Sequence, residues 1–413
     1  MHMTKNVFFE QLEKYGQQKF IGTFEGLKPE AQAKILEQAD LLDFNMIADV
    51  DVKQQELPRG VIEPIKTLTI EEYKDKAEHY RKIGLDAIRA GKIGALLLAG
   101  GMGTRLGYDH AKGMYDIGVT RPVFIFQRTI ENIMDVTKEA GCSIHLYVMT
   151  SHLNDTETRE FFKEHNYFGY DGEYVHFYMQ DMAPCLDREG NMFLSAEDTI
   201  AMSPNGNGGF YSSLVNSGLG KQMHEAGIEY INVFAVDNVL QRIADPVFVG
   251  ATIESGCATG AKVVAKAAPD ERVGAICLED GTPSVVEYYD MTPELMAAKL
   301  DDGTPAYNFG VILNYLFRVK DIDEVVSSKL PVHLVNKKVP FLDYVDGKPA
   351  TVTPEKPNAF KLETLSLDLV HLTDSCLPFE VVREKEFAPI KNPTGIDSVE
   401  SARKLLEDCG YTL

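Results

Sequence analysis

The sequence predicts an α/β protein with a mixed, mostly parallel sheet, and three observations support this fold class. Short apolar runs of strand type alternate with helical stretches from residue 94 onward. These runs are continuously apolar rather than alternating, as in strands that are buried on both faces. A glycine cluster follows the first run, and loops at this end of a strand bind ligands in open α/β sheets.

Length, composition and charge narrow the classes of function. The 413 residues, 44% of them hydrophobic, are enough for a sizeable core and for two or three structural units. The formal net charge of −21 makes nucleic acid and anionic membranes unfavourable partners, because the field of the chain repels polyanions. No apolar run approaches the roughly 18 residues of a membrane span, and the six cysteines show no metal-ligand spacing. We therefore expect a cytoplasmic protein with reduced cysteines.

Three consecutive regions are predicted along the chain. Residues 1–91 carry apolar side chains at helical spacing and are expected to be helical. Residues 92–320 form the central sheet domain, with strand-type runs at 93–101, 143–151, 174–181, 230–238 and 261–266 and helices at 124–141 and 155–165. In residues 321–413 the strands shorten and prolines gather, which indicates a small C-terminal α+β unit.

The stretch "LLLAGGMGTRLG" (residues 96–107) ends the first strand in a glycine-rich loop. Glycines allow positive φ and leave backbone amides open to a ligand. Two known phosphate-binding motifs do not fit, because the dinucleotide fingerprint needs glycine at Leu106 and the P-loop needs GK[ST] after its glycines. The glycines alone fit an unliganded tight turn equally well. Arg105 and Lys112 favour a polyphosphate, since a forked cation and a point-like cation suit its two ends.

Two charged residues have competing interpretations. Asp237 ends the strand-type run "INVFAV" and fits a Mg²⁺ ligand, because this ion takes few carboxylates and completes its shell with phosphate oxygens. It fits equally well as the N-cap of a helix over "DNVLQRIAD" (237–245). Lys112 fits either a phosphate contact or a solvated ion pair with Asp109 or Asp116.

A series of motifs follows the glycine loop along the chain. In order they are "KGMYDIG" (112–118), "MSPNGNGGFYSSL" (202–214), "VDNVLQRIADPVFVG" (236–250), "GAKVVAK" (260–266), "VVEYYD" (285–290), "YNFGVILNYLF" (307–317) and "FAPIKN" (387–392). Together with the loop they resemble the eukaryotic-type UDP-N-acetylglucosamine pyrophosphorylases, the uridylyltransferase branch of the nucleotide-diphospho-sugar transferases. The resemblance covers essentially the whole chain. It departs at Ala111, where a proline usually precedes the lysine, and at "TRPVFIFQ" (120–127).

The resemblance implies a fold and a reaction. The fold is the Rossmann-like fold of nucleotide-diphospho-sugar transferases. The reaction converts UTP and a sugar 1-phosphate into a UDP-sugar and pyrophosphate, with Mg²⁺ as cofactor, and the implied sugar is N-acetylglucosamine or its galactosamine counterpart. The attacking sugar phosphate is already an anion. No Ser/His/Asp triad is therefore needed, and catalysis rests on positioning and on neutralising phosphate charge.

The resemblance also implies roles for individual residues. The implied catalytic cations are Arg105, Lys112 and Lys391, and the C-terminal unit that carries Lys391 is expected to close over the site. Asp237 is the implied metal ligand. The residues implied for the nucleotide are Leu98, Ala99, Gly100, Gly101, Gly103, Thr104, Gln180 and Gly206. Those implied for the sugar are Asn207, Gly260, Glu287 and Asn308, with Gly260 leaving room for the sugar ring.

Other interpretations stay open at the level of sequence. The same chemistry could act on glucose or galactose 1-phosphate, and a nucleotide-sugar-binding protein without turnover would keep the same fold. Gln180, the implied reader of the uracil edge, also fits a solvated glutamine at the end of a strand. A nicotinamide dehydrogenase is disfavoured because its fingerprint fails. No feature of the sequence indicates an oligomeric state.

Overall fold

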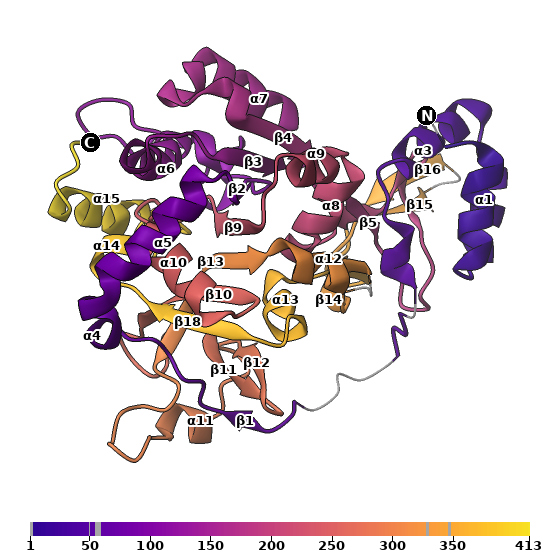
Figure 1. Ribbon diagram of the computed structural model, residues 1–413. Coiled ribbons are helices and arrows are strands. Elements are labelled where there is room, and N and C mark those ends of the chain that lie inside the picture. Colours follow the sequence, from indigo (N-terminus) through magenta and orange to yellow (C-terminus); the bar gives the residue numbers. More distant parts are fainter. Residues whose placement is uncertain (1–2, 49, 54–58, 328–329, 346–347) are drawn as a thin grey trace. The chain divides into compact units, whose positions relative to one another are not determined.

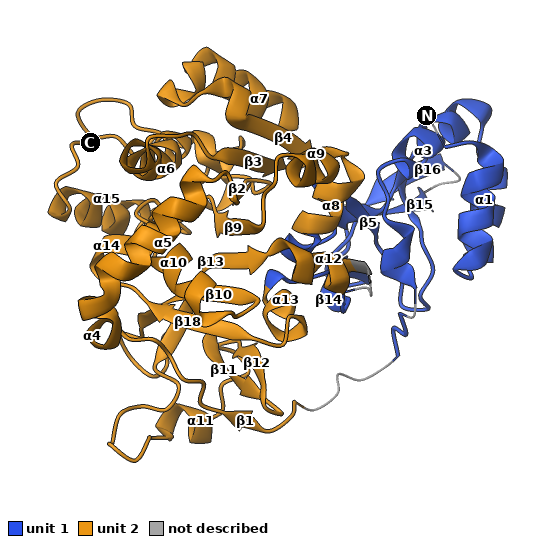
Figure 2. Ribbon diagram, viewed as in Figure 1, with its two compact units in different colours: residues 1–58, 180–209, 330–366 blue, residues 59–179, 210–329, 367–413 orange. Residues whose placement is uncertain are grey.

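The structure of the chain is a computed structural model that describes residues 3–48, 50–53, 59–327, 330–345 and 348–413. It divides into two compact units, each built from three separated segments (Figure 2). Unit 1 comprises residues 1–58, 180–209 and 330–366, and unit 2 comprises residues 59–179, 210–329 and 367–413. This division differs from the three consecutive regions 1–91, 92–320 and 321–413 that the sequence predicts, because segments far apart in the chain share one core in each unit.

Unit 2 is built around a ten-stranded mixed sheet (Figure 1). Its strands are β1 (Ile62–Glu63), β2 (Ile93–Leu98), β3 (His145–Thr150), β4 (Val175–Met179), β9 (Tyr230–Ala235), β10 (Thr259–Ala265), β11 (Ala275–Glu279), β12 (Thr282–Val286), β13 (Phe309–Arg318) and β18 (Cys376–Glu380). The main path runs β1-β11-β13-β9-β2-β3-β4, while β10, β12 and β18 pair beside it. Strands β9, β2, β3 and β4 are parallel neighbours, whereas β13 is antiparallel to β9. The predicted α/β class with a mixed sheet is confirmed.

The helices of unit 2 include two that cross at backbone contact. They are α4 (Ile70–Tyr73), α5 (Ala77–Arg89), α6 (Ile125–Ala140), α7 (Asp155–Glu164), α8 (Phe210–Asn216), α9 (Leu219–Glu225), α10 (Pro246–Ser255), α11 (Pro293–Ala297), α12 (Val319–Ser327), α13 (Ser366–Leu372), α14 (Arg383–Glu386) and α15 (Val399–Asp408). A side chain at Gly84 of α5 would lie 2.0 Å from the Pro246 carbonyl oxygen, and one at Gly250 of α10 would lie 1.8 Å from that of Tyr80. Only glycine therefore permits this crossing.

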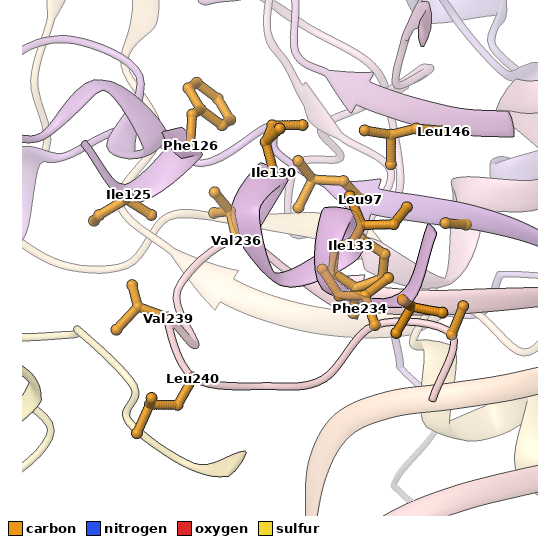
Figure 3. Packing of buried hydrophobic residues seen from close by; sticks show 14 of the residues in the cluster. Leu97, Ile125, Phe126, Ile130, Ile133, Leu146, Phe234, Val236, Val239 and Leu240 are labelled. Carbon is orange, nitrogen blue, oxygen red and sulfur yellow. The ribbon is translucent and has the colours of Figure 1, made fainter. Parts of the chain in front are cut away.

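The core of unit 2 lies between α6 and the parallel strands (Figure 3). Ile130 and Ile133 of α6 are fully buried in the same cluster as Leu97 of β2 and Phe234 of β9. Val236, which follows β9, extends this cluster beyond the end of the strand. The apolar period of α6 thus fixes the helix on the sheet, and the loops that leave β2 and β9 start from a rigid base.

Unit 1 combines the first helices with short strands from later in the chain. Its elements are α1 (Lys5–Lys14), α2 (Gln18–Glu25), α3 (Pro29–Ala39), β5 (Met182–Pro184), β6 (Leu194–Ala196), β7 (Thr199–Ile200), β8 (Met202–Pro204), β14 (His333–Lys337), β15 (Phe341–Val345), β16 (Lys348–Val352) and β17 (Ala359–Glu363). The strands form four antiparallel pairs, β14-β17, β15-β16, β5-β8 and β6-β7. Phe8, Ala183 and Leu362 are fully buried in one cluster, which joins all three segments of the unit.

Most predicted elements are confirmed, and one helix is wrong. A strand overlaps each of the five predicted runs, and α6 and α7 match the helices predicted over 124–141 and 155–165. Residues 237–245 are irregular instead of helical, and α10 begins only at Pro246, with Asp245 as its N-cap. β18, α14 and α15, predicted in a separate C-terminal unit, belong to unit 2. Among the described residues, no helix is long and apolar enough to cross a membrane.

Two neighbouring histidines near the start of β3 and β4 predict that the folded protein becomes less stable in acid. His145 Nδ1 and His176 Nε2 lie 2.9 Å apart. Burial lowers the pKa of both imidazoles, and His145 lowers that of His176 further. Each folded-state pKa lies below the unfolded value of 6.5, so protonation favours the unfolded chain. The contribution of this pair to the free energy of unfolding is therefore fully present above pH 6.5 and is lost as the pH falls below that value.

The measurement is urea denaturation at about pH 7.5 and about pH 5. We expect the free energy of unfolding to fall less between these conditions in the double variant His145→Gln/His176→Gln than in the wild type. His152→Gln, at an exposed position, serves as the control and should keep the wild-type loss. Equal losses in the wild type and the double variant would remove this pair from the acid response.

Candidate active site

The glycine-rich loop after β2 folds back on itself. The Gly103 amide donates to the His110 carbonyl at 2.8 Å, and the Lys112 amide donates to the Gly101 carbonyl at 3.0 Å. Gly103 has no room for a side chain, because a Cβ there would lie 2.9 Å from the Tyr108 carbonyl oxygen. The chain therefore brings Lys112, which begins a short 3-10 helix, back beside the first glycines of the loop.

Helix α7 anchors both ends of this loop. Asn154, which precedes α7 and is fully buried, donates its side-chain amide to the Ala99 carbonyl at 3.0 Å. Glu157 accepts hydrogen bonds from the Ala111 amide at 2.6 Å and from His110 Nδ1 at 2.9 Å. The position of Lys112 is thus set by contacts on the residues immediately before it.

The backbone of the loop offers free hydrogen-bond donors at two glycines. Leu98 and Ala99 are buried, and the Ala99 amide already donates to the Met149 carbonyl at 2.8 Å. Within the described part of the chain, the amides of Gly100 and Gly101 have no hydrogen-bond partner. Adjacent free amides in a glycine loop form a site for an anion. Of the residues predicted to bind the nucleotide over 98–101, only Gly100 and Gly101 therefore have free amides in the described structure. Thr104 is exposed at the surface of the same loop.

Asp237 lies at the same sheet edge as the loop. β9 and β2 are parallel with Ala235 opposite Leu98, so the segments that follow them leave the sheet together. Val236 and Val239 are buried, whereas the Asp237 side chain between them is 24% exposed. Because residues 237–245 are irregular, the alternative role of Asp237 as the cap of a helix is excluded.

Lys112 pairs with Asp237 and not with an acid of its own loop. Its Nζ lies 3.7 Å from Asp237 Oδ2, and its side chain is 16% exposed. Asp116 Oδ1 instead accepts hydrogen bonds from the amides of Gly118 and Val123, which shapes the next turn. The solvated ion pair with Asp109 or Asp116 is therefore wrong, because the parallel strands bring a residue from a distant part of the chain closer.

Three cations converge on this point. Burial lowers the pKa of the Lys112 ammonium, the charges of Arg105 and Lys391 lower it further, and Asp237 opposes them. Lys391 is itself paired with Asp397, so the Asp237 carboxylate is left to face Lys112, with the charge of Arg105 nearby. Cations gathered beside free backbone amides favour an anionic ligand.

Lys391 belongs to unit 2 and is tied directly to the Asp237 loop. The Ile390 amide donates to the Asp237 carbonyl at 2.9 Å, and the Ala388 amide donates to Asn238 Oδ1 at 2.9 Å. The Lys391 ammonium lies 3.0 Å from Asp397 Oδ2. The expectation that Lys391 lies in a separate C-terminal unit is therefore wrong, because these hydrogen bonds join its segment to the loop within unit 2.

Glu287 and Asn308 lie at strand ends of the same unit. Glu287 follows β12, and burial and Asp290 raise the pKa of its carboxyl group while the charges of Arg59 and Lys391 lower it. Glu287 is therefore within electrostatic reach of Lys391. Asn308 precedes β13, is half-buried, and accepts a hydrogen bond from the Lys266 amide at its carbonyl oxygen at 2.7 Å.

Gly260 has a different reason to be glycine than the one expected. A Cβ on this residue would lie 2.3 Å from Thr252 Oγ1 and 2.8 Å from a ring atom of Phe248, both on α10. The missing side chain accommodates the packing of α10 against β10. The expectation that Gly260 leaves room for a sugar ring is therefore not supported.

Gln180, Gly206 and Asn207 lie together in unit 1. Gln180 is 9% exposed, and its Nε2 donates to Asn205 Oδ1 at 3.1 Å and to the Gly206 carbonyl at 2.6 Å. Gly206 has φ of +87°, and a Cβ there would lie 2.2 Å from the Thr364 carbonyl oxygen. Asn207 Oδ1 accepts from the Ser366 amide at 2.9 Å. Both donors of the Gln180 amide are used, so its Oε1 remains as an acceptor, and the interpretation of Gln180 as a freely solvated side chain is excluded.

The site fits a divalent ion only if phosphate oxygens complete its shell. Among the described residues, no group of three or more histidines, cysteines, aspartates and glutamates is arranged to hold a metal ion. Asp237 contributes one partly exposed carboxylate beside the glycine loop. Mg²⁺ is usually bound by one or two carboxylates together with substrate phosphates, and it does not need a complete cage of protein ligands.

The sequence did not point to several polar residues that hold the site in place. Asn238, Asn232, Asn314 and Gln241 are buried amides around the Asp237 loop, and Lys262 is a fully buried lysine in β10. For Asn232, Asn314 and Lys262 the signal that could have identified them is a polar side chain inside an apolar strand, as in "INVF", "ILNYL" and "AKVVA". Asn238 and Gln241 lie in the irregular segment and carry no such signal. Such residues are buried only when hydrogen-bonded, so each marks a built network.

The fold and the site define a class, an α/β protein that binds a phosphorylated ligand where a glycine loop and clustered cations meet at the carboxyl edge of parallel strands. The sequence profile described as UTP–glucose-1-phosphate uridylyltransferase matches residues 43–407. The chain belongs to this family.

Relatives within the family carry N-acetylhexosamine names. The chain is 35% identical over 421 residues to the UDP-N-acetylhexosamine pyrophosphorylase-like protein 1 of Homo sapiens, covering 96% of this chain and 82% of that protein. It is 34% identical over 414 residues to the UDP-N-acetylglucosamine pyrophosphorylase of Saccharomyces cerevisiae, covering 96% and 85%. The solved UDP-N-acetylglucosamine pyrophosphorylase of Trypanosoma brucei, in complex with an inhibitor, superposes with a TM-score of 0.82 at 26% identity and covers 97% of this chain and 84% of that one. The resemblance found in the sequence is thereby confirmed.

Proposed function

We propose that the protein transfers the uridylyl group of UTP to an N-acetylhexosamine 1-phosphate, giving a UDP-N-acetylhexosamine and pyrophosphate. The observation that carries this proposal is the Lys112–Asp237 pair at the ends of β2 and β9, beside a glycine loop with free amides at Gly100 and Gly101. The charges of Arg105 and Lys391 also act on Lys112. The names of the relatives favour an N-acetylated sugar over glucose or galactose.

The chemistry needs charge neutralisation more than proton transfer. A phosphate oxygen of the sugar phosphate attacks the α-phosphorus of UTP in line, the bond to the β-phosphate oxygen breaks, and pyrophosphate leaves. Negative charge on the transferring and leaving oxygens is stabilised by donors that are already in place. A base is not required, since the nucleophile is ionised at neutral pH.

The backbone amides of the loop and the three cations each have a proposed role in binding phosphate. The amides of Gly100 and Gly101, with Gly103 and Thr104 at the turn of the loop, would hold the triphosphate. Arg105, which presents a forked group, would hold the departing pyrophosphate. Lys112 and Lys391 would face the α-phosphate.

Asp237 would hold Mg²⁺ together with phosphate oxygens of the substrates. When bound, the ion supplies positive charge to those oxygens. The Asp237 carboxylate also lies 3.7 Å from the Lys112 ammonium, so the metal ligand and the phosphate-binding cation are neighbours.

Sugar recognition is proposed for side chains that keep free hydrogen-bonding capacity. Asn207 uses its Oδ1 for Ser366, which leaves its Nδ2 to donate to a hydroxyl or carbonyl group. Glu287, with its raised pKa, and Asn308 are likewise proposed to contact the sugar.

The test is pyrophosphate release from UTP with a panel of sugar 1-phosphates. We expect N-acetylglucosamine 1-phosphate or N-acetylgalactosamine 1-phosphate to have a kcat/KM about tenfold or more above that of glucose 1-phosphate, because a buried group left unpaired costs about 1–3 kcal/mol. Preference for glucose 1-phosphate would favour the alternative substrate. No release with any member of the panel would favour a binding protein without turnover.

Gln180 predicts selectivity for uracil over cytosine. The amide orientation leaves Oε1 as the acceptor, which suits the N3–H donor of uracil and opposes the N3 acceptor of cytosine. We expect CTP to react about tenfold more slowly than UTP or worse, since mismatching a buried acceptor costs about 1–3 kcal/mol.

Gln180→Ala should reduce the ratio of kcat/KM for UTP to that for CTP. We expect kcat/KM to fall for UTP and to stay nearly unchanged, at its low value, for CTP. Gln38→Ala is a matched control, because Gln38 is another unit 1 glutamine with both side-chain groups on backbone atoms. Unchanged UTP over CTP selectivity in Gln180→Ala would contradict the base-reading role.

A further inference from the structure

We propose that Asn238 is a positioning residue that holds the Lys391 segment against the Asp237 loop, so that Lys391 faces the phosphates. The inference rests on the proposed function, and it assigns a role to a side chain that touches no substrate. Asn238 is 2% exposed and directly follows Asp237 in the chain.

Both ends of the Asn238 amide bind the backbone of the segment that leads to Lys391. Its Nδ2 donates to the Glu386 carbonyl at 2.7 Å, and its Oδ1 accepts from the Ala388 amide at 2.9 Å. The backbone continues the contact, since the Val239 amide donates to the Ala388 carbonyl at 3.3 Å. One side chain therefore captures two backbone groups, one on each side of Phe387, and Lys391 follows three residues after Ala388.

The loop that carries Asp237 and Asn238 is itself held in place by side-chain hydrogen bonds. Gln241 Nε2 donates to the Asn238 carbonyl at 3.0 Å and to the Ala235 carbonyl at 2.7 Å. Asn314 Nδ2 from β13 donates to Gln241 Oε1 at 3.1 Å, and Asn232 Nδ2 from β9 donates to Asn314 Oδ1 at 2.8 Å. These side chains replace the backbone hydrogen bonds that an irregular loop lacks.

The segment side is held by a buried ion pair. Lys262 of β10, fully buried, contacts the Glu386 carboxylate, and its Nζ donates to the Arg242 carbonyl at 2.9 Å. Glu386 Oε2 also accepts from the Arg242 amide at 3.1 Å. Breaking such a pair leaves an unpaired buried charge, so Glu386 stays in place. The contact with Arg242 also ties Glu386 to the Asp237 loop. Asn238 is thus the side chain that fixes the backbone on both sides of Phe387, between this anchor at Glu386 and Lys391.

The expected consequence is a loss of turnover that runs through Lys391. Removing the amide leaves the anchor at Glu386 intact, but the segment from Phe387 to Lys391 is then held to the loop only by the backbone bonds at Ala388 and Ile390, so it can shift. A displacement of about 1 Å at a catalytic group costs up to about a hundredfold in rate. The position of Lys391 matters most when charge develops on the phosphates, so kcat should fall more than the KM for UTP rises.

The experiment measures pyrophosphate release from UTP and N-acetylglucosamine 1-phosphate by the full chain in four forms: the wild type, Asn238→Ala, Lys391→Ala and the double variant. We expect Asn238→Ala to lower kcat about tenfold or more in the wild type but about threefold or less when Lys391 is already alanine, because residues that act as a unit are not additive. Equal factors in the two backgrounds would overturn the proposal. So would an unimpaired Lys391→Ala enzyme.

A matched control separates positioning from loss of stability. Asn358 of unit 1 also binds one backbone residue with both ends of its amide, through the Val339 amide at 2.8 Å and the Val339 carbonyl at 2.9 Å. Asn358→Ala should leave kcat within about twofold, because it removes the same kind of hydrogen bonds without moving Lys391. A loss of kcat in Asn358→Ala equal to that in Asn238→Ala would overturn the positioning role.

If Asn238→Ala does not fold, Asn238→Ser carries the same test, since a single short hydroxyl cannot bind both the Glu386 carbonyl and the Ala388 amide as the two ends of the amide do. It is expected to lose part of the kcat in the wild type and none in the Lys391→Ala background, and an equal loss in both would again overturn the proposal. Failure of the proposed function is distinguishable, because the wild type would then release no pyrophosphate.

Discussion

Lys112→Ala is expected to lower turnover about a hundredfold or more at saturating substrates, because removing one preorganised donor to developing charge costs about 2.7–4 kcal/mol. The Lys112 ammonium is largely buried and faces Asp237, with Arg105 and Lys391 close enough to lower its pKa. Its removal leaves Asp237 partly exposed and able to hydrate, so the melting temperature should change little. The measurements are steady-state pyrophosphate release and thermal unfolding of the same preparations.

The same two strands provide the control for this variant. Lys92 Nζ lies 2.9 Å from Glu229 Oε1, immediately before β2 and β9, at the opposite edge of the sheet from Lys112 and Asp237. Lys92→Ala should keep turnover within about twofold, since an exposed pair contributes about 0–1 kcal/mol to stability. If Lys112→Ala also kept turnover within about threefold, Lys112 would be only the ion partner of Asp237, and the phosphate role would be wrong.

Asp237→Asn is expected to lower turnover about a hundredfold or more and to raise the Mg²⁺ concentration needed for half-maximal rate, since a metal ligand contributes several kcal/mol to charge stabilisation. The asparagine keeps the shape of the side chain, and the backbone carbonyl still accepts from Ile390. The fold should therefore persist, which thermal unfolding checks. The measurement is the rate as a function of Mg²⁺ at fixed UTP.

Glu229→Gln is the matched control, because it neutralises the carboxylate of the other Lys–acid pair on the same strands. It should leave the rate and its Mg²⁺ dependence unchanged. Asp237→Asn with near-normal turnover and an unchanged Mg²⁺ response would show that Asp237 serves only to pair with Lys112.

Much of the candidate site could be predicted because its parts are local in sequence. A buried run followed by glycines is enough to place the loop of residues 99–112 at a strand end, and "INVFAV" places Asp237 at another. The two strands are parallel neighbours, so these ends meet. Gln180 was also placed correctly at the end of β4, but the direction in which its amide faces follows from Asn205 and Gly206.

The helix over residues 237–245 was predicted incorrectly because helical spacing of apolar residues is a weak signal over one short segment. Val239 and Ile243 lie four residues apart and are both buried, as a helix would require. The side chains of Asn238 and Gln241 nevertheless supply hydrogen bonds to the irregular backbone and favour it over a helix.

The sequence by itself determined the α/β class, the strands that end at the site, the glycine loop and the residue types that can neutralise phosphate. These follow from hydrophobic period and from chemistry within a few residues. Only the tertiary structure decided that Asp237 pairs with Lys112, that α10 occupies the space at Gly260, and that the segment carrying Lys391 belongs to the unit that holds the glycine loop. The physical reason is that these contacts join residues far apart in the chain, and their partners are selected by strand order, helix packing and buried hydrogen bonds, which no local pattern encodes.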